Sequence, residues 1–125
     1  MMGFGSARAC LIAAALLLAG VGLAQAAGAL AVGACGAYGM AFDYARADAA
    51  ETAALRKCEG KGCRVVSAMK KNCAAVAVDL RNVCGPYGFS SASRLGLAQN
   101  QALRECYRNG GKDCVIRAFV CDAKG

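Results

Sequence analysis

The stretch CGAYGMAF at residues 35–42 returns, with changes, as CGPYGFSS at residues 84–91. Both versions begin with Cys-Gly-x-Tyr-Gly, and they stand 49 residues apart. A motif that recurs in this way is typical of a chain built from tandem copies of one unit.

The two copies stay in step beyond the motif. ALRKC at residues 54–58 matches ALREC at residues 102–106 at an offset of 48, so one copy lacks a single residue between the two motifs. Each copy continues with a cysteine and an apolar run, at Cys63 or Cys114, and closes with a fourth cysteine, Cys73 or Cys121. We place the first repeat at about residues 28–73 and the second at about residues 74–121.

Aromatic residues alternate with small or polar ones just after the first cysteine of each copy. Tyr38, Met40 and Phe42 follow this rhythm in the first copy, and Tyr87 and Phe89 follow it in the second. A two-residue period of this kind predicts a half-buried strand.

Alanine-rich runs follow at residues 47–58 and 95–106, where small residues recur at three- and four-residue steps. This period predicts helices with small contact faces, with Ser93 as the N-cap of the second. Gly60 and the run 109–111 are the expected helix terminators.

Short apolar runs stand before each aromatic strand, at residues 29–32 and 74–78, and after each helix, at residues 63–69 and 114–120. Each unit is thus predicted to be strand, strand, helix, strand. The fold class that follows is α+β: a tandem duplication packed as one domain, since no linker separates the copies. Alanine buries little area per residue, so we expect disulfides to carry much of the stability.

The N-terminal residues have the features of a signal peptide. Arg8 precedes an apolar stretch that is too short for a membrane span, and Ala24-Gln25-Ala26 fits the signal peptidase rule. We expect cleavage after about Ala26, which leaves residues 27–125 as one mature domain. Cys10 is removed with the signal and does not stand where a lipid anchor is attached. The prediction is a periplasmic or secreted protein without a stable membrane anchor.

Eight cysteines remain after cleavage, an even number that suits an oxidising compartment. Cys58 and Cys63 flank a short glycine-containing turn, as do Cys106 and Cys114, so we expect a bridge that clips each helix to the following strand. Internal symmetry favours Cys73–Cys121 and Cys35–Cys84 as bridges between the halves. Eight cysteines allow 105 connectivities, and the sequence does not choose among them by itself.

The same cysteines are poor candidates for metal or redox chemistry. Their spacings do not match zinc or iron–sulfur motifs, there is no Cys-x-x-Cys pair, and the chain has no histidine. The absence of histidine also removes the usual general base. Asp48 and Glu51 suit a solvated first helical turn, and the pair Ser67 and Lys70 has no spacing that requires catalysis. We expect no cofactor, no metal, no catalytic residues and a protein that is not an enzyme.

Two surface features are open to a functional interpretation. Aromatics at alternate strand positions are most often core, yet Tyr38, Phe42, Tyr87 and Phe89 are the candidates for a partly exposed binding surface. Removal of Arg8 lowers the formal net charge from +7 to +6, with the cations scattered along the chain. A scattered charge on an exported protein argues against nucleic acid as a partner.

The sequence resembles a family of small exported bacterial proteins, the domain of unknown function 4189. The residues that carry the resemblance are GAYG at 36–39, Ala54-Leu55 with Cys58, CRVV at 63–66, KNCAAVA at 71–77 and the segment from Cys114 to Cys121. It covers nearly the whole mature chain. Cys35, Cys84 and Arg46 depart from the family pattern, which has no cysteine after the opening strand and favours a serine helix cap. The resemblance implies an exported domain and no established chemistry.

Three functions remain open. The first is a non-enzymatic binding module for a protein partner in the periplasm or outside the cell, such as an inhibitor or immunity-type protein. The second is a secreted cationic factor acting on anionic envelopes or host surfaces. The third is an unfamiliar enzyme acting on cell-wall polymer.

Overall fold

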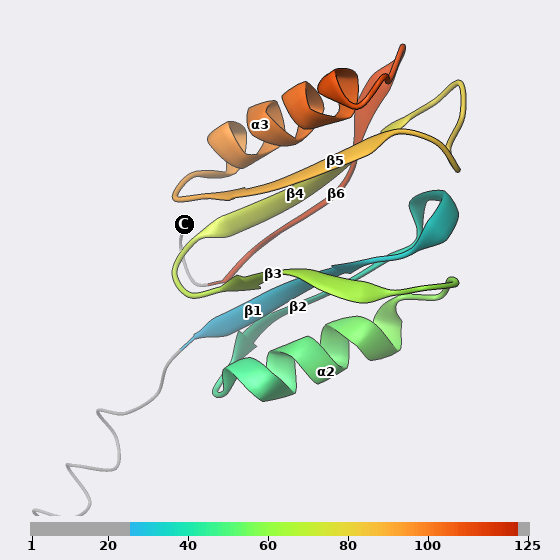
Figure 1. The fold of residues 1–125 in the computed structure, drawn as a ribbon. Coiled ribbons are helices and arrows are strands. Elements are labelled where there is room, and N and C mark those ends of the chain that lie inside the picture. The colour runs from blue at the N-terminus through green and yellow to red at the C-terminus, as the bar shows by residue number, and fades with distance from the viewer. Residues whose placement is uncertain (1–25, 123–125) are drawn as a thin grey trace, which may run out of the picture.

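A computed structural model of the protein describes residues 26–122 (Figure 1). The predicted signal peptide, including Cys10, lies outside these residues except for Ala26. The elements, in chain order, are β1 (Ala27–Val32), the 3-10 turn η1 (Ala34–Gly36), β2 (Tyr38–Tyr44), α2 (Ala47–Lys57), β3 (Arg64–Met69), β4 (Cys73–Asp79), β5 (Tyr87–Ala92), α3 (Leu95–Arg108) and β6 (Cys114–Cys121). Within the described part of the chain, no helix has the length and apolar character needed to cross a membrane.

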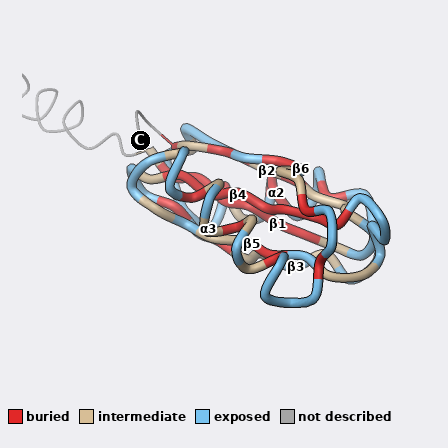
Figure 2. The backbone as a smooth tube through the Cα atoms, turned by 90° about the horizontal axis from the view of Figure 1, so that it is seen from above, coloured by how far each residue is buried: buried red, intermediate tan, exposed pale blue. Residues whose placement is uncertain are grey.

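The strands form two antiparallel sheets of three strands each, in the orders β2-β1-β3 and β5-β4-β6. Each sheet is therefore formed by the three strands of one predicted unit. The first strand of the unit lies at the centre of the sheet. The α+β prediction is confirmed. Every residue of β1 and of β4 is buried, and Figure 2 shows these two strands running through the middle of the molecule.

The units pack with their sheets face to face and their helices outside, as four layers (Figure 1). Strand β2 contacts β6 across the interface, β3 contacts β5, and β1 contacts β4. If the two units are exchanged, β2 takes the place of β5 and β6 takes the place of β3, so the first of these contacts becomes the second. An approximate twofold axis therefore relates the units. The molecule accordingly has two equivalent seams, one between β2 and β6 and one between β3 and β5.

Helix and sheet approach closely within each unit, because the facing residues are small. Ala50 and Ala54 of α2 are fully buried against alanines of the first sheet, and Ala98 and Ala102 of α3 pack in the same way on the second. A Cβ atom added at Gly88 would lie 2.3 Å from the Cys106 nitrogen, too close for any side chain. The glycine of the Tyr-Gly motif is therefore required by the helix that lies over it.

Larger side chains fill the space between the sheets. Leu30, Val32 and Met69 from the first unit meet Val76 and Val120 from the second, and all five are buried. On the central strands β1 and β4, the residues that face the helix are alanine or cysteine, whereas the larger residues Leu30, Val32 and Val76 face the other sheet. The interface between the units is thus the main aliphatic core of the protein.

The helix ends differ in part from expectation. The N-cap of α3 is Arg94 and not Ser93, and its side chain makes no capping hydrogen bond. Arg46 caps α2, also without a side-chain bond. Helix α3 ends at Arg108 and is followed by Gly110 with φ +104°, which fits the predicted glycine terminator.

Four disulfides join the pairs that the internal symmetry favours: Cys35–Cys84, Cys58–Cys63, Cys73–Cys121 and Cys106–Cys114. The expectation that Cys73–Cys121 connects the halves is wrong. Strand β4 begins at Cys73, which pairs with Cys121 across β4 and β6, so this bridge lies within the second unit. Cys35–Cys84 is the disulfide that joins the two units.

The structure also locates the residue by which the copies differ in length. Ala41 of β2 pairs with Ala29, and Tyr44 pairs with Ala27. Strand β2 thus has two residues between these pairs where β1 has one, which is a bulge. The corresponding part of β5 contains one residue fewer and is regular. The bulge includes Asp43, whose φ of +59° places it in the left-handed region. The sequence offset between the two copies therefore changes from 49 to 48 because β2 has a β-bulge that β5 lacks.

Candidate functional site

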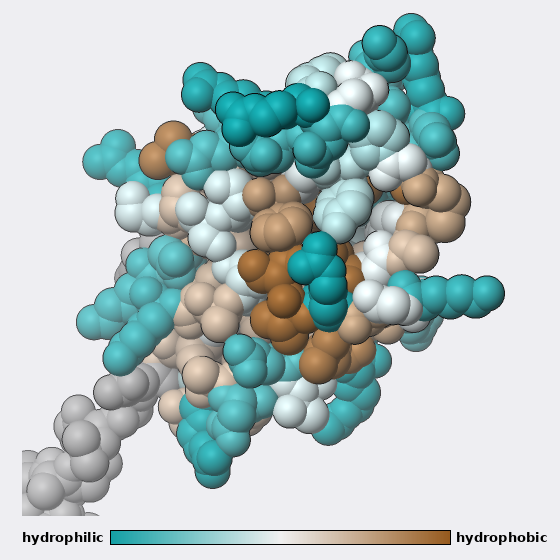
Figure 3. All heavy atoms as spheres, viewed as in Figure 1, coloured by the Kyte–Doolittle hydropathy of each residue, from teal (hydrophilic) through white to brown (hydrophobic). Residues whose placement is uncertain are grey.

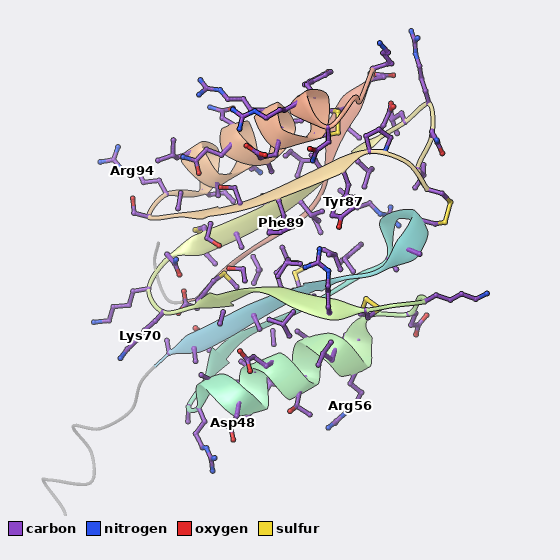
Figure 4. All side chains as sticks on the ribbon, viewed as in Figure 1. Asp48, Arg56, Lys70, Tyr87, Phe89 and Arg94 are labelled. Carbon is purple, nitrogen blue, oxygen red and sulfur yellow. A yellow bond between two sulfur atoms is a disulfide. The ribbon has the colours of Figure 1, made fainter. Side chains whose placement is uncertain are left out.

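The four candidate aromatic residues are divided between the two seams. Tyr38 and Phe42 lie on β2, and Tyr87 and Phe89 lie on β5. Tyr38 and Phe89 are partly buried against the core between the sheets, whereas Phe42 and Tyr87 are exposed. The structure therefore does not combine all four into one surface. Figure 4 shows Tyr87 and Phe89 on the side of β5 that faces β3.

Arg64 connects the seam between β3 and β5. Its Nη2 donates a hydrogen bond of 3.0 Å to the Tyr87 hydroxyl, and its guanidinium carbon lies 5.7 Å from the centre of the Phe89 ring. The Tyr87 and Phe89 rings are stacked, with centroids 6.3 Å apart. In the same view, Figure 3 shows apolar atoms gathered at the centre of this face and surrounded by hydrophilic side chains. The exposed Arg64 guanidinium is therefore held by a cation–π interaction with Phe89 and by the Tyr87 hydroxyl.

Arg117 makes the corresponding link across the opposite seam. Its Nε donates a 3.0 Å hydrogen bond to the Gly36 carbonyl, and its guanidinium carbon lies 5.3 Å from the centre of the Tyr38 ring. Arg117 is the extra residue at the register shift of β6, because Ala77 pairs with Ile116 and Val76 pairs with Ala118. Bulges commonly re-aim a side chain, and here the bulge accompanies an arginine that reaches the other unit.

A pocket of about 70 Å³ lies where the turns of the two units meet. We call it the axial pocket. Its floor and walls are aliphatic, from Val32, Val76, Val78 and Val83, and Tyr87 and Arg117 also line it. The turns that complete it are residues 33–37 and 84–85, which include the Cys35–Cys84 disulfide.

The position of this pocket follows from the symmetry of the fold. Cys35 and Cys84 are equivalent residues of the repeated motif and are bonded to each other, so their disulfide lies at the approximate twofold axis. Both cysteines are exposed, in contrast to the buried Cys58, Cys73 and Cys106 of the other bridges. The disulfide thus lies at the surface, on the rim of the pocket.

The lining groups define what the axial pocket can bind. Valine side chains favour an apolar group, and a space of about 70 Å³ limits that group to a small one. Arg117 is exposed and offers a cation beside it. The pocket thus suits a short aliphatic or thioether group that carries, or lies next to, a carboxylate.

A family model described as "Domain of unknown function (DUF4189)" matches residues 27–121 of this chain. The chain belongs to this family. The search of curated proteins and the search of solved structures each returned no match.

The match extends over all the strands and helices of the DUF4189 fold and over both walls of the axial pocket. It also includes Ser67, whose hydroxyl is buried and shares a hydrogen bond with the Ser91 hydroxyl across the β3–β5 seam. Lys70 stands exposed in the turn after β3, pointing away from the body of the molecule (Figure 4). Among residues 26–122, no group of histidine, cysteine, aspartate or glutamate is arranged to hold a metal ion.

Two buried carboxylates of the DUF4189 fold escaped the sequence analysis. Asp79 accepts hydrogen bonds from the backbone N–H groups of Arg81, Lys112 and Asp113. Burial of this carboxyl acts to raise its pKa, but these three hydrogen bonds and the charge of Arg81 outweigh burial, so the pKa is lowered. Asp79 thereby holds two neighbouring turns together.

Asp122 holds the connection between the two units in place. It is fully buried and accepts hydrogen bonds from the backbone N–H groups of Lys71, at 2.6 Å, and Asn72, at 2.8 Å. No sequence pattern marked either aspartate, because all of these backbone groups except the N–H of Arg81 are distant in sequence and are brought near only by the tertiary structure. Both carboxylates have structural roles.

Proposed function

We propose that this protein is an exported, non-enzymatic binding module, of inhibitor or immunity type, whose axial pocket receives an apolar side chain of a protein partner. The observation that carries the proposal is the pocket itself: aliphatic walls from both units, open to the surface, with Arg117 beside it. Inserting one apolar side chain into a desolvated pocket is how many protein interfaces obtain most of their binding energy.

The surroundings of the pocket favour recognition, because they are rigid before a partner arrives. The Cys35–Cys84 disulfide fixes the two turns relative to each other, and Arg117 is held by Gly36 and Tyr38. A preformed site loses little conformational entropy on binding. On this basis the partner presents an aliphatic or thioether side chain next to a carboxylate that meets Arg117.

Filling the pocket tests the proposal. Val83 lines the pocket and is 38% exposed, so Val83→Phe occupies the mouth without entering the core. Leu80→Phe is the matched control, because Leu80 lies in the same connection between β4 and β5, is 57% exposed and does not line the pocket. Immobilised wild type, both variants and Arg117→Ala are exposed to envelope extract of the producing organism. Retained proteins are then quantified by mass spectrometry.

The expected result is a protein retained in stoichiometric amount by the wild type and by Leu80→Phe, and lost from Val83→Phe. Arg117→Ala reduces its retention. Retention of the same proteins by all four baits contradicts the proposal, as does the absence of any stoichiometric partner. Unchanged near-UV circular dichroism shows that Val83→Phe remains folded.

A second candidate, a secreted cationic factor that binds anionic surfaces, is favoured by the distribution of charge. All 13 lysine and arginine residues between residues 26 and 122 are exposed, while two of the eight acidic residues, Asp79 and Asp122, are buried. The surface is thus more basic than the sequence suggests, although Lys70, Arg94 and Arg56 lie in separate regions (Figure 4). Binding to anionic vesicles that disappears in moderate salt supports this candidate, and no binding at low salt removes it.

A further inference from the structure

The seam between β2 and β6 carries two large exposed apolar side chains that play no part in the axial pocket. Phe42 on β2 is 54% exposed and Phe119 on β6 is 49% exposed. A groove of about 270 Å³ lies between these strands, lined by Met40, Phe42, Phe119, Val120 and Cys121. We call it the β2–β6 groove. Both of its strands are edge strands, since β2 pairs only with β1 and β6 only with β4.

The duplicated fold contains its own comparison for this groove. Met40 pairs with Leu30 and Phe89 with Val76, so Phe42, two residues beyond Met40, corresponds to Ser91. Phe119 pairs with Ala75, and Ala68 pairs with the equivalent Ala29. The opposite seam therefore has serine and alanine where the β2–β6 groove has two phenylalanines.

This difference shows that the fold does not need aromatic residues at either position. The β3–β5 seam is closed by the hydrogen bond between the Ser67 and Ser91 hydroxyls and by Arg64. At the β2–β6 seam the equivalent of Ser67 is Ala118, and the phenylalanines remain exposed to water. Exposed aromatic residues that the fold does not require mark an interaction surface.

The charge around the groove indicates which partner it fits. The residues that line it carry no charge. By contrast, Arg117 lines the axial pocket. Two further grooves also contain a charged side chain: Glu105 lines the groove beside β5, and Lys57 lines the groove beside the start of β2. Two copies of a protein with a strongly positive net charge repel each other, and this repulsion is weakest at a surface that carries no charged side chains.

We propose that the β2–β6 groove is the interface of a symmetric dimer, in which Phe42 and Phe119 of each copy pack into the groove of the other. A twofold interface uses the same surface on both partners, so it needs projecting side chains and a recess together. This groove supplies both. The bulge at Asp43 disturbs the edge of β2, so the copies associate through side chains and do not extend the sheet.

Sedimentation of the purified, fully oxidised protein over micromolar to millimolar concentrations tests the proposal. The test variant, Phe42→Ser/Phe119→Ala, installs the residues that the opposite seam has at the same positions. Leu97→Ala is the matched control, because Leu97 is 48% exposed on α3 and lies outside the groove. The wild type and Leu97→Ala form a dimer, and the double variant raises the dissociation constant at least about tenfold, because central aromatic residues dominate interface energy.

Salt provides a second readout. Added salt strengthens this dimer, because it screens repulsion between two positive copies while the apolar contact is unaffected. The proposal is overturned if the wild type is monomeric throughout the concentration range, if the double variant dimerises like the wild type, or if salt dissociates the dimer. Val83→Phe, which fills the axial pocket, dimerises like the wild type, so failure of the proposed function leaves this result unchanged.

Discussion

Cys35 and Cys84 occupy the same position in two copies of one motif and are bonded to each other at the approximate twofold axis of the molecule. They are 49 residues apart in sequence, and theirs is the disulfide that joins the units. The other three bridges each lie within one unit. Among the disulfides, this bond should therefore contribute most directly to the stability of the assembled sandwich, in addition to the aliphatic core between the sheets.

Replacing both cysteines tests this dependence. In the loop-entropy account, Cys35→Ser/Cys84→Ser lowers the free energy of unfolding by about 4 kcal/mol, because the bridge closes a long loop. Cys58→Ser/Cys63→Ser, whose loop is short, costs about 2 kcal/mol in the same account. Urea unfolding monitored by circular dichroism measures both. Equal losses from the two double variants would contradict the idea that the axial bridge restricts the unfolded chain more than a short clip does.

A comparison of alanine substitutions at Gly88 and Gly96 distinguishes a steric requirement for glycine from the general effect of replacing a glycine. Gly88→Ala should destabilise the domain by about 1–3 kcal/mol or more, because its methyl group meets backbone atoms of α3 that cannot yield. Gly96→Ala is the control: it lies in α3 with no atom within 4 Å of the added carbon, and should stabilise by up to about 1 kcal/mol. Thermal unfolding compares the two, and a neutral Gly88→Ala would show that the helix can move away.

Asp79 should make stability depend on pH on the acid side. Its pKa is lower in the folded protein than the value of about 3.9 expected in the unfolded chain. The carboxylate therefore contributes stability that is fully present above the unfolded pKa and is lost as pH falls through the folded pKa. Asp79→Asn removes this contribution, so the variant has a lower Tm at pH 7 and a flatter decline of Tm below about pH 4. Parallel pH profiles for the two proteins would contradict the role assigned to Asp79.

The hydroxyl pair across the β3–β5 seam should behave as a coupled unit. Ser91→Ala leaves the buried Ser67 hydroxyl without its partner and should cost about 1–2 kcal/mol. Ser67→Ala/Ser91→Ala removes both hydroxyls, and alanine already occupies the equivalent of Ser67 in the other unit. The double variant should thus lose less than the sum of the single losses, and a double-mutant cycle of unfolding free energies measures the difference. Strict additivity would show that the bond contributes nothing specific.

Much of each unit was predictable because local patterns carry the information. Alternating aromatics placed β2 and β5, the alanine steps placed α2 and α3, and the shared motif established that the second unit follows the plan of the first. The cysteine spacings suggested the clips Cys58–Cys63 and Cys106–Cys114 for the same reason, since both partners flank one short turn. The boundary between the two repeats was less predictable. Cys73 is the fourth cysteine of its copy, as Cys121 is, but in the structure Cys73 is the first residue of β4 and pairs with Cys121.

The sequence by itself determined the repeat, the order of strands and helices, and the two short clips Cys58–Cys63 and Cys106–Cys114, because these depend on neighbours within one turn, one strand or one unit. Only the tertiary structure decided how the two sheets face each other. That packing placed Tyr38 and Tyr87 on opposite seams, brought Arg64 and Arg117 into contact with the other unit, and formed the axial pocket from both units. Contacts between residues distant in sequence also buried Asp79 and Asp122. Apart from the Cys35–Cys84 bridge, the contacts between units join residues that are not equivalent in the repeat, so no local pattern records them.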